Sequence, residues 1–292
     1  MKAIVCRKPG RPDVLELEEI DTPSFAEDGL LVRVRASSIN PVDFFPLSRM
    51  AYMARLLSRG FKAKAVVIGT DFAGTVEAVG KSVTEFKPGD EVFGGKDRST
   101  FAEYVSIPAK GAVVAKPANV TFEQAAAVPV AAVTALQALR DHGRVRQGQR
   151  VLVNGASGGV GTFAVQIAKT FGAHVTAVCS PRNVETARAL GADRVIDYTR
   201  EDFTRSGESY DLMIDVAGNH SWAECKRYSH RPAKWWRLEA QHTRCGVRTA
   251  RSNISSAYGW RPSVARRKPL SSSRSSIRQT CWSCRSYSWK EK

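Results

Sequence analysis

The feature that most constrains the fold is a glycine-rich loop between an apolar run and a helical pattern. Residues 151–154 are Val-Leu-Val-Asn, the loop Gly155–Gly161 follows, and apolar residues recur at helical spacing over Val160–Phe171. The free N–H groups at a helix N-terminus favour an anion, and glycine lets that anion approach the backbone. The order therefore predicts a nucleotide pyrophosphate loop in a βαβ unit. A tight turn without a ligand is the alternative, and a Walker loop is excluded because no Gly-Lys-Ser/Thr follows.

Short apolar runs and helical patterns alternate on both sides of this loop. We expect strands at Arg150–Asn154, His174–Cys179, Arg194–Ile196 and Asp211–Val216, and helices at Val160–Phe171 and Val184–Leu190. Such alternation predicts right-handed crossovers and a doubly wound parallel sheet. Four strands would lie in the spatial order 3-2-1-4, with the fourth strand at an edge.

The first 120 residues have a different pattern, in which turn formers such as Pro88-Gly89-Asp90 separate short apolar runs. The expected strands are Lys2–Cys6, Leu30–Ala36, Gly74–Val79, Glu91–Phe93, Ala102–Val105 and Val113–Ala115. A helix is expected over Pro46–Ser58, and Thr121 opens an alanine-rich helical stretch that runs over Ala125–Leu139. This pattern predicts a β-barrel-like domain before the α/β domain.

The net charge of +16 lies almost entirely in the last quarter of the chain. Residues 1–220 hold 27 Lys and Arg against 25 Asp and Glu, whereas residues 221–292 hold 17 against 3. All six tryptophans lie in that last segment, which has no Phe and only six Leu, Ile and Val. This composition is typical of a disordered basic tail, so the two parts of the chain need separate interpretations.

The end of the second α/β strand indicates which dinucleotide the loop would bind. An NAD site places Asp or Glu there to accept a hydrogen bond from the ribose 2′-hydroxyl. Cys179 and Ser180 stand at that position, and Arg182 follows. Arginine can accommodate a 2′-phosphate, so the sequence favours NADPH. A solvated arginine at a helix start is the alternative for Arg182.

Several motifs recur together in one order along the chain. They are Ser38–Asp43, Gly69–Val76, Phe86–Gly94, Pro129–Leu139, Gly155–Gly161, and Leu190–Asp193 before Asp197-Tyr198. As a set they resemble the medium-chain dehydrogenase/reductase superfamily, in its zinc-free quinone oxidoreductase branch. The resemblance covers about residues 1–227. It implies a GroES-like substrate domain over residues 1–125, an incomplete Rossmann domain over residues 126–227, and an active site in the cleft between them.

The resemblance also implies roles for single residues. Asn40 and Asp43 would line the nicotinamide end, and Tyr52 would line the substrate pocket; these three are the catalytic candidates. Asp43 as a helix cap and Tyr52 as a surface tyrosine are the alternatives. The cofactor-binding candidates are Thr134 at the carboxamide, Ala156, Ser157, Gly158, Gly159, Val160 and Gly161 at the pyrophosphate, Ser180, Arg182 and Tyr198 at the 2′-phosphate, and Ala217 and Gly218 at the adenosine side.

A zinc site is not expected. Catalytic zinc needs three protein ligands, and the family's cysteine ligand would fall at Asn40 and its His-Glu pair at Thr70-Asp71. No cysteine occurs in residues 94–100, where the structural zinc lobe would lie. The resemblance then implies hydride transfer from NADPH to a quinone or an α,β-unsaturated carbonyl compound, with no general acid identified.

Residues 228–292 resemble no family, and three interpretations compete. A shifted reading frame from about Arg227 explains the Arg, Ser, Trp and Cys enrichment. A disordered basic tail that binds nucleic acid is the second, and would make this a non-enzymatic protein. A small zinc module built on Cys281 and Cys284 is the third. If the last Rossmann strands are missing, we expect poor expression, weak quinone reduction and no family-like homodimer.

The remaining features concern location. No apolar run of 18 residues occurs, so we expect no membrane span. The N-terminus lacks the apolar segment of a signal peptide, and the six cysteines form no disulfide framework, which favours the cytoplasm.

Overall fold

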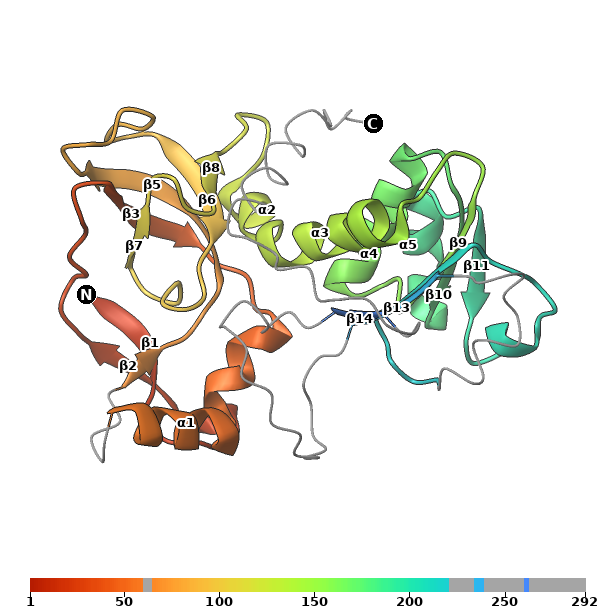
Figure 1. Cartoon of the computed structure of the whole chain (residues 1–292), viewed down its shortest axis with the longest axis horizontal. Coiled ribbons are helices and arrows are strands. Elements are labelled where there is room, and N and C mark those ends of the chain that lie inside the picture. The colour runs from red at the N-terminus through yellow and green to blue at the C-terminus, as the bar shows by residue number, and fades with distance from the viewer. Residues whose placement is uncertain (60–64, 221–233, 239–259, 263–292) are drawn as a thin grey trace. The chain divides into compact units, whose positions relative to one another are not determined.

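The computed structural model describes residues 1–59, 65–220, 234–238 and 260–262 (Figure 1). The first compact unit is Met1–Val130, and the second consists of the described residues from Ala131 to 262. The domain limits expected at 125/126 and 227/228 stay predictions. Most of the expected basic tail, residues 228–292, lies outside the described residues. No helix in the described part of the chain is both long and apolar enough to cross a membrane.

The first unit is built on a five-stranded antiparallel sheet in the order β7-β3-β5-β6-β8. Its strands are β3 (Gly29–Ala36), β5 (Asp71–Val79), β6 (Glu91–Gly95), β7 (Tyr104–Pro108) and β8 (Val113–Ala115). The register of β3 against β5 shifts twice, and such bulges bend a sheet. Buried Leu30, Val32, Phe72 and Val105 pack together as its core. The expected β-barrel-like domain is confirmed.

A second, three-stranded antiparallel sheet, β2-β1-β4, completes the strands of this unit. β1 (Lys2–Cys6) is the strand expected from the sequence, whereas β2 (Leu15–Glu19) and β4 (Val66–Val67) were not expected. β2 alternates leucine with glutamate, which is a half-buried strand pattern, and β4 is too short to show any period. Both pair with β1, so tertiary pairing defines them.

Helices of the first unit begin at polar caps. The 3₁₀ helix η2 (Pro41–Leu47) follows Asn40, and α1 (Arg49–Arg59) follows it where a single helix was expected from Pro46. Thr121 caps α2 (Phe122–Ala126), because its hydroxyl accepts from the Gln124 N–H in a capping box.

The stretch Ala125–Leu139, expected to be helical, is helical but divided into separate segments. α2 ends at Ala126, α3 covers Pro129–Leu136, and a π-helical segment, η3, covers Gln137–Gly143. Pro129 has no N–H to donate and disfavours helical geometry in the residue before it, so the helix breaks there. Pro129 then becomes the first residue of α3, which is a favoured proline position.

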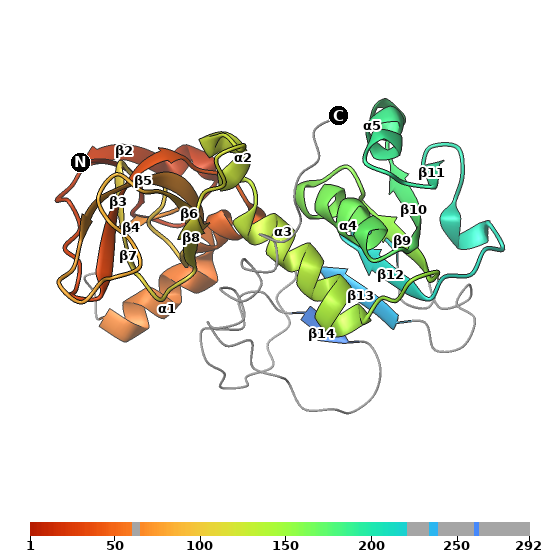
Figure 2. The same ribbon diagram turned by 90° about the horizontal axis from the view of Figure 1, so that it is seen from above.

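The second unit has a doubly wound sheet in the order β11-β10-β9-β12-β13-β14 (Figure 2). The four expected strands are present as β9 (Arg150–Asn154), β10 (His174–Cys179), β11 (Arg194–Asp197) and β12 (Leu212–Asp215). All are parallel, in the predicted order 3-2-1-4. The crossover helices are α4 (Gly159–Thr170) and α5 (Val184–Ala189), with short 3₁₀ turns η4 (Pro181–Asn183) and η5 (Phe203–Arg205).

The expectation that β12 would be an edge strand, with no strand pattern after Arg227, is wrong. β13 (Lys234–Leu238) pairs with β12 in parallel, and β14 (Trp260–Pro262) pairs with β13 in antiparallel fashion. An edge strand offers a row of free backbone groups, and Lys-Trp-Trp-Arg-Leu has tryptophans that favour strands. Because residues 221–292 contain few Leu, Ile and Val, the apolar pattern did not predict this strand.

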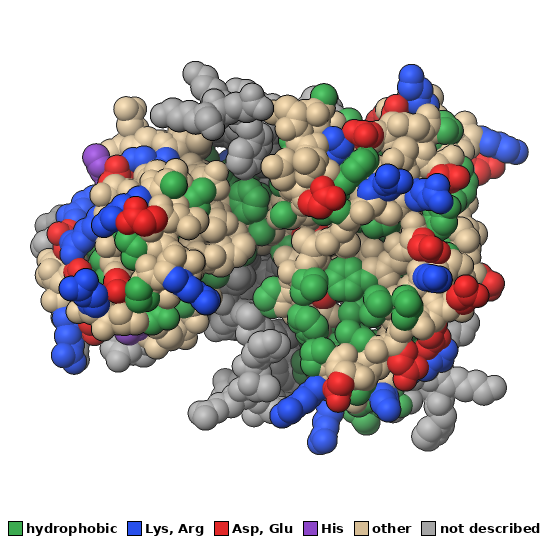
Figure 3. Space-filling view, turned by 180° about the vertical axis from the view of Figure 1, so that it is seen from behind, with side chains coloured by type: hydrophobic (Ala, Val, Ile, Leu, Met, Phe, Trp, Pro, Cys, Tyr) green, Lys and Arg blue, Asp and Glu red, His purple; other side chains and the backbone are tan. Residues whose placement is uncertain are grey.

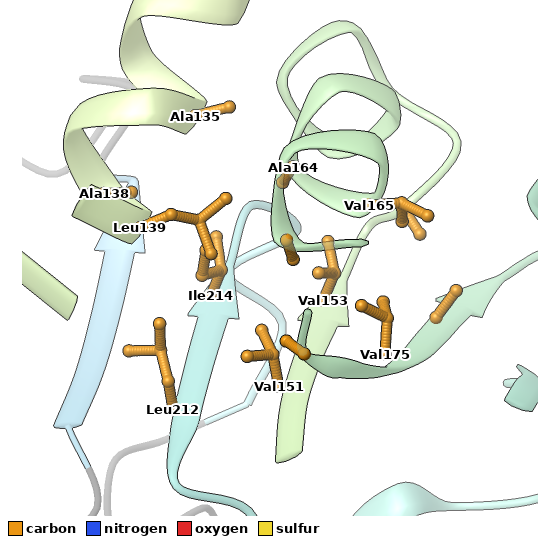
Figure 4. Close-up of a cluster of buried hydrophobic side chains, with 14 of the residues drawn as sticks. Ala135, Ala138, Leu139, Val151, Val153, Ala164, Val165, Val175, Leu212 and Ile214 are labelled. Carbon is orange, nitrogen blue, oxygen red and sulfur yellow. The ribbon is translucent and has the colours of Figure 1, made fainter. Parts of the chain in front are cut away.

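Both faces of this parallel sheet are buried. Figure 4 shows side chains of α3 and η3 (Ala135, Ala138, Leu139), of α4 (Ala164, Val165) and of three strands packed together on one face. On the other face, Leu152, Val178, Ile196, Phe203 and Tyr210 form a second cluster. Successive residues of β9 therefore enter different clusters, as a strand buried on both sides requires.

Candidate active site

Asn40 and Asp43, the two catalytic candidates of the first unit, form a capping box at the start of η2. The Asn40 backbone N–H donates to Asp43 Oδ2 at 2.6 Å, and Thr70 Oγ1 donates to Asp43 Oδ1 at 2.5 Å. Both Asn40 and Asp43 are buried. Asp43 thus does what its structural alternative predicted, namely cap a helix; its catalytic role stays a prediction.

A third polar residue, Asp71, connects this box to a neighbouring helix. It is the first residue of β5 and has 0% exposure. Its Oδ2 accepts from Ser38 Oγ at 2.9 Å and from Asn40 Nδ2 at 3.0 Å. Both carboxylate oxygens lie 3.2 Å from the N–H of Val130, the second residue of α3. One buried carboxylate therefore contacts the Asn40 side chain and the first turn of α3.

Burial dominates the protonation of this cluster. It raises the pKa of Asp71 to about 7, even though hydrogen bonds from Val130, Ser38 and Asn40 act in the opposite direction and the charge of Asp43 adds to the rise. Burial also raises the pKa of Asp43, against the hydrogen bonds from Thr70 and Asn40. The cluster can therefore exchange a proton near neutral pH.

Tyr52, the third catalytic candidate, lies in the first half of α1 and is partly buried. Its backbone N–H donates to the Ser48 carbonyl at 3.1 Å. Apolar side chains stand exposed around this segment: Ile39 beside Asn40, then Phe45, Met50, Met53 and Leu57. Among the described residues of the first unit, Leu17 is the one large exposed hydrophobic side chain outside the range 39–57.

The glycine loop adopts the geometry that a phosphate loop needs. Gly155 has φ +85°, which favours glycine, and Gly158 is the N-cap of α4. A Cβ on Gly161 would lie 2.1 Å from the Gly155 carbonyl oxygen, so only glycine fits there. Ser157, Gly158 and Gly159 are exposed, whereas Ala156 and Gly161 are buried. The first N–H groups of α4 lack partners within the helix and can donate hydrogen bonds to an anion.

The turn after β12 lies beside this loop. A Cβ on Gly155 would lie 3.0 Å from the Ala217 backbone nitrogen, and Ala217 and Gly218 are exposed. The structure thus brings the pyrophosphate and adenosine-side candidates together. Sequence reasoning missed what holds them: Asn154 Nδ2 donates to Asp215 Oδ1 at 2.9 Å, and the Gly218 N–H donates to the same oxygen at 2.8 Å.

The 2′-phosphate candidates lie at the carboxyl ends of β10 and β11. Ser180 follows β10 and Tyr198 follows β11, and the Tyr198 N–H donates to the Cys179 carbonyl at 3.3 Å. Tyr198 has 58% of its surface exposed, and Arg182 is also exposed. Ser180 Oγ accepts from Asn183 Nδ2 at 3.0 Å. Ser180 and Tyr198 therefore end adjacent strands, at the edge where a Rossmann fold holds the ribose.

Thr134, the candidate for the carboxamide, is buried in the second turn of α3. It lies four residues after Val130, which is one helical turn. The helix that Asp71 contacts at its start is thus the helix that carries Thr134.

Zinc does not fit the residues at the family's ligand positions. Asn40, Thr70 and Asp71 offer an amide, a hydroxyl and one carboxylate, and they are hydrogen-bonded within the cluster described above. Zinc in proteins is bound mainly by Cys and His. Cys6 and Cys179 are free and buried in separate units, and within the described residues no three His, Cys, Asp or Glu side chains could hold a metal ion together.

Comparison with known proteins agrees with this geometry. Residues 26–118 match the sequence profile of the alcohol dehydrogenase GroES-like domain, and residues 159–231 match that of the zinc-binding dehydrogenase. A quinone-oxidoreductase homolog from spinach chloroplasts (Spinacia oleracea) is 36% identical over 226 residues, which cover 73% of this chain and 67% of that protein. The chain belongs to the medium-chain dehydrogenase/reductase superfamily. Within that superfamily it falls in the quinone oxidoreductase-like branch.

Two further members of the superfamily are informative. An NADPH-dependent alkenal/one oxidoreductase of Arabidopsis thaliana chloroplasts is 38% identical over 238 residues, or 75% of this chain and 58% of that protein. The quinone oxidoreductase of Escherichia coli, solved in complex with NADPH, superposes with a TM-score of 0.69 at 27% identity, over 80% of this chain and 72% of that one. The chain thus spans about two thirds or less of the length of the two plant relatives.

Asp71, Asn154 and Asp215 are the functional candidates that sequence reasoning missed. Asn154 and Asp215 end apolar runs, Val-Leu-Val-Asn154 and Leu-Met-Ile-Asp215, and Asp71 is the first residue of β5. A polar side chain at such a buried position requires a partner, and that signal could have identified all three.

Proposed function

We propose that this chain is built as an NADPH-dependent oxidoreductase that transfers a hydride to a quinone or an α,β-unsaturated carbonyl compound without zinc. One observation carries the proposal: the glycine loop at the start of α4 lies at the same sheet edge as the end of β10, where Cys179 and the following Ser180 stand in place of a carboxylate. The first feature fits a pyrophosphate, and the second fits a 2′-phosphate better than a free 2′-hydroxyl.

The residues of the second unit fit NADPH in kind. The N–H groups of Ser157 and the first turn of α4 would hold the pyrophosphate, and Ser180, Arg182 and Tyr198 would contact the 2′-phosphate. Ala217 and Gly218 would border the adenosine side, and Thr134 the carboxamide. When bound, the reduced nicotinamide supplies a hydride. The carboxylate of Asp197 lies close to the proposed 2′-phosphate region. Its Oδ1 already accepts hydrogen bonds from the Thr199 N–H and from the Thr199 hydroxyl.

The substrate class follows from the first unit. Without a Lewis acid, the electrophile must already be electron-poor, as quinones and enones are. Ile39, with 73% of its surface exposed, and Phe45 flank Asn40 and Asp43, so an apolar substrate can bind beside the polar cluster. The orientation of substrate and the exclusion of water would be the protein's contribution, with Asn40, Asp43 and Tyr52 as the candidate contacts.

We also propose that turnover is weak and that the family-like homodimer does not form. Residues 221–292 contain only six Leu, Ile and Val with which to cover β13 and β14. The nucleic-acid alternative rests on residues 228–292, most of which lie outside the described residues. On the face in Figure 3, the Lys and Arg side chains of the described residues lie among Asp and Glu.

The test is oxidation of NADPH by the purified chain with a panel of quinones and enones, with and without a zinc chelator. We expect slow oxidation that depends on the acceptor and is unchanged by the chelator. NADPH binding without any acceptor-dependent oxidation would contradict the reductase assignment, and inhibition by the chelator would contradict zinc independence.

A further inference from the structure

Asp71 is a buried carboxylate that the proposed mechanism does not use. It is fully buried in β5, yet its carboxylate has partners on two other segments: Ser38 and Asn40 after β3, and Val130 at the start of α3. Such a group holds several elements in one arrangement, and leaving it without partners would be costly.

The hydrogen bonds determine how the Asn40 amide is oriented. Its Nδ2 has two hydrogens, of which one is donated to Ser38 Oγ at 3.1 Å and the other to Asp71 Oδ2 at 3.0 Å. An ionised carboxylate can only accept, so the NH₂ end of the amide must face Asp71. A protonated Asp71 could donate instead, and would no longer require that orientation.

The same carboxylate also anchors α3. The Val130 N–H is one of the free donors of the first helical turn, and a negative charge there is stabilised by the helix dipole. Asn40 and Thr134, which lies one turn after Val130 on α3, are both candidates for the nicotinamide end. Asp71 therefore fixes one of these residues directly and the start of the helix that carries the other.

We propose that Asp71 is a positioning residue for hydride transfer, which holds the Asn40 amide and the first turn of α3 in the arrangement the reaction needs. This inference rests on the proposed function, because Asn40 and Thr134 matter only if the nicotinamide binds there. Ionised Asp71 accepts these hydrogen bonds more strongly than the neutral acid would, because charge-assisted hydrogen bonds are stronger, so the arrangement depends on pH. The groups that act on it are the Ser38 hydroxyl, the Asn40 amide, the Val130 N–H and the charge of Asp43.

The first experiment measures kcat against pH for the full chain and for Asp71→Asn. In the unchanged chain kcat should fall as the pH drops below about 7, where burial places the pKa of Asp71. Asp71→Asn should lower kcat about tenfold to a hundredfold, as expected for a misplaced catalytic contact. It should also remove the inflection and leave KM for NADPH within about twofold.

Two further variants keep the test decisive. Asp90→Asn is the matched control, because Asp90 Oδ2 accepts from the Lys87 N–H at 3.0 Å in an exposed turn of the same unit, and its profile should be unchanged. Ser38→Ala removes one donor to ionised Asp71, so it should move the inflection to higher pH even if Asp71→Asn does not fold. An unchanged inflection in both Asp71→Asn and Ser38→Ala would overturn the proposal.

A readout independent of activity separates this inference from the proposed function. The side-chain NH₂ signals of Asn40, assigned by comparison with Asn40→Ala, should shift near pH 7 in the unchanged chain and should not shift in Asp71→Asn. If the chain oxidises no NADPH but the signals titrate, the function is wrong and the coupling of Asp71 to Asn40 stands. If NADPH is oxidised but the signals do not titrate, the function stands and this inference is wrong.

Discussion

Two buried aspartates, Asp71 and Asp43, titrate differently from the free amino acid. Asp71 and Asp43 both have a raised pKa because burial disfavours their charged forms. The sequence shows both residues inside recognisable motifs, but it does not show that they share a buried network with Ser38, Asn40 and Thr70. That network depends on two loops and a helix start meeting in space, which no local pattern encodes.

Asp71 makes stability depend on pH. Its pKa rises from 3.8 in the unfolded chain to about 7 in the folded one, so the folded protein holds the extra proton and the contribution of Asp71 to stability is greatest in acid. That contribution is complete below about pH 4 and is lost as the pH rises through about 7, a change of roughly 4 kcal/mol at most. Asp71→Asn should flatten this decline in urea titrations.

Asp193→Asn is the control for that measurement, because the pKa of Asp193 is shifted in the opposite direction to that of Asp71. Burial of Asp193 is outweighed by hydrogen bonds from Lys169 and the Val175 N–H, so the pKa of Asp193 is lowered. Its stabilisation is present at neutral pH and is lost in acid. A decline with rising pH that persists in Asp71→Asn would contradict the account of Asp71.

Arg182 is the residue on which we propose that the choice of cofactor depends. Arg182→Ala should weaken NADPH binding by about tenfold, because a charge-assisted bond to a phosphate is lost, and should leave NADH binding unchanged. Arg188→Ala is the matched control, since Arg188 is exposed one turn into α5 and pairs with Glu185 at 2.6 Å. Fluorescence titration with each cofactor measures the affinities of both variants. An equal loss of affinity for NADPH and NADH in Arg182→Ala would contradict the assignment of Arg182 to the 2′-phosphate.

At the scale of secondary structure, the strong periodic patterns predicted the elements and the weak ones did not. The four expected strands of the parallel sheet and helix α4 lie within a residue or two of their predicted bounds. The break at Pro129, the strand β2 and the pairing of β13 with β12 were not predicted. Each depends on a proline at a helix start or on a partner strand, so the local apolar pattern could not reveal it.

The tight turn between β9 and α4 gives the sharpest prediction at this scale. Gly161→Ala would place a methyl group 2.1 Å from the Gly155 carbonyl oxygen, so the loop must shift. We expect a loss of about 2–4 kcal/mol in the free energy of unfolding, measured by thermal melting.

Gly158→Ala is the control for Gly161→Ala. Its added Cβ would come no closer than 3.6 Å to the Gly155 oxygen, and its φ of −80° suits any residue. We expect a loss of about 1 kcal/mol or less. Equal melting temperatures for the two variants would show that the loop does not need glycine at position 161.

At the scale of the whole molecule, the chain combines a nearly neutral enzyme body with a strongly basic end. The family match ends at residue 231, close to where the resemblance was expected to stop. We still propose that a shifted reading frame starts near Arg227. β13 lies after that residue and pairs with β12. Reading the coding DNA one base out of frame there should restore aliphatic strands and a glycine turn, and stop codons in both other frames would contradict that interpretation.

The basic end gives a prediction that separates the two function classes. Residues 263–292 hold eight Lys and Arg against one Glu. Deleting them should reduce retention on a polyanion column and its salt dependence, while NADPH binding stays unchanged. Loss of NADPH binding on this deletion would show that the basic end belongs to the cofactor site.

The central claim is that the glycine loop and the ends of β10 and β11 form a site for NADPH. The most direct test is to measure the dissociation constants of NADPH and NADH for the full chain under one set of conditions. The account predicts that NADPH binds at least about tenfold more tightly, because the 2′-phosphate meets Arg182 and β10 does not end in a carboxylate. Equal affinities, or a preference for NADH, would contradict it.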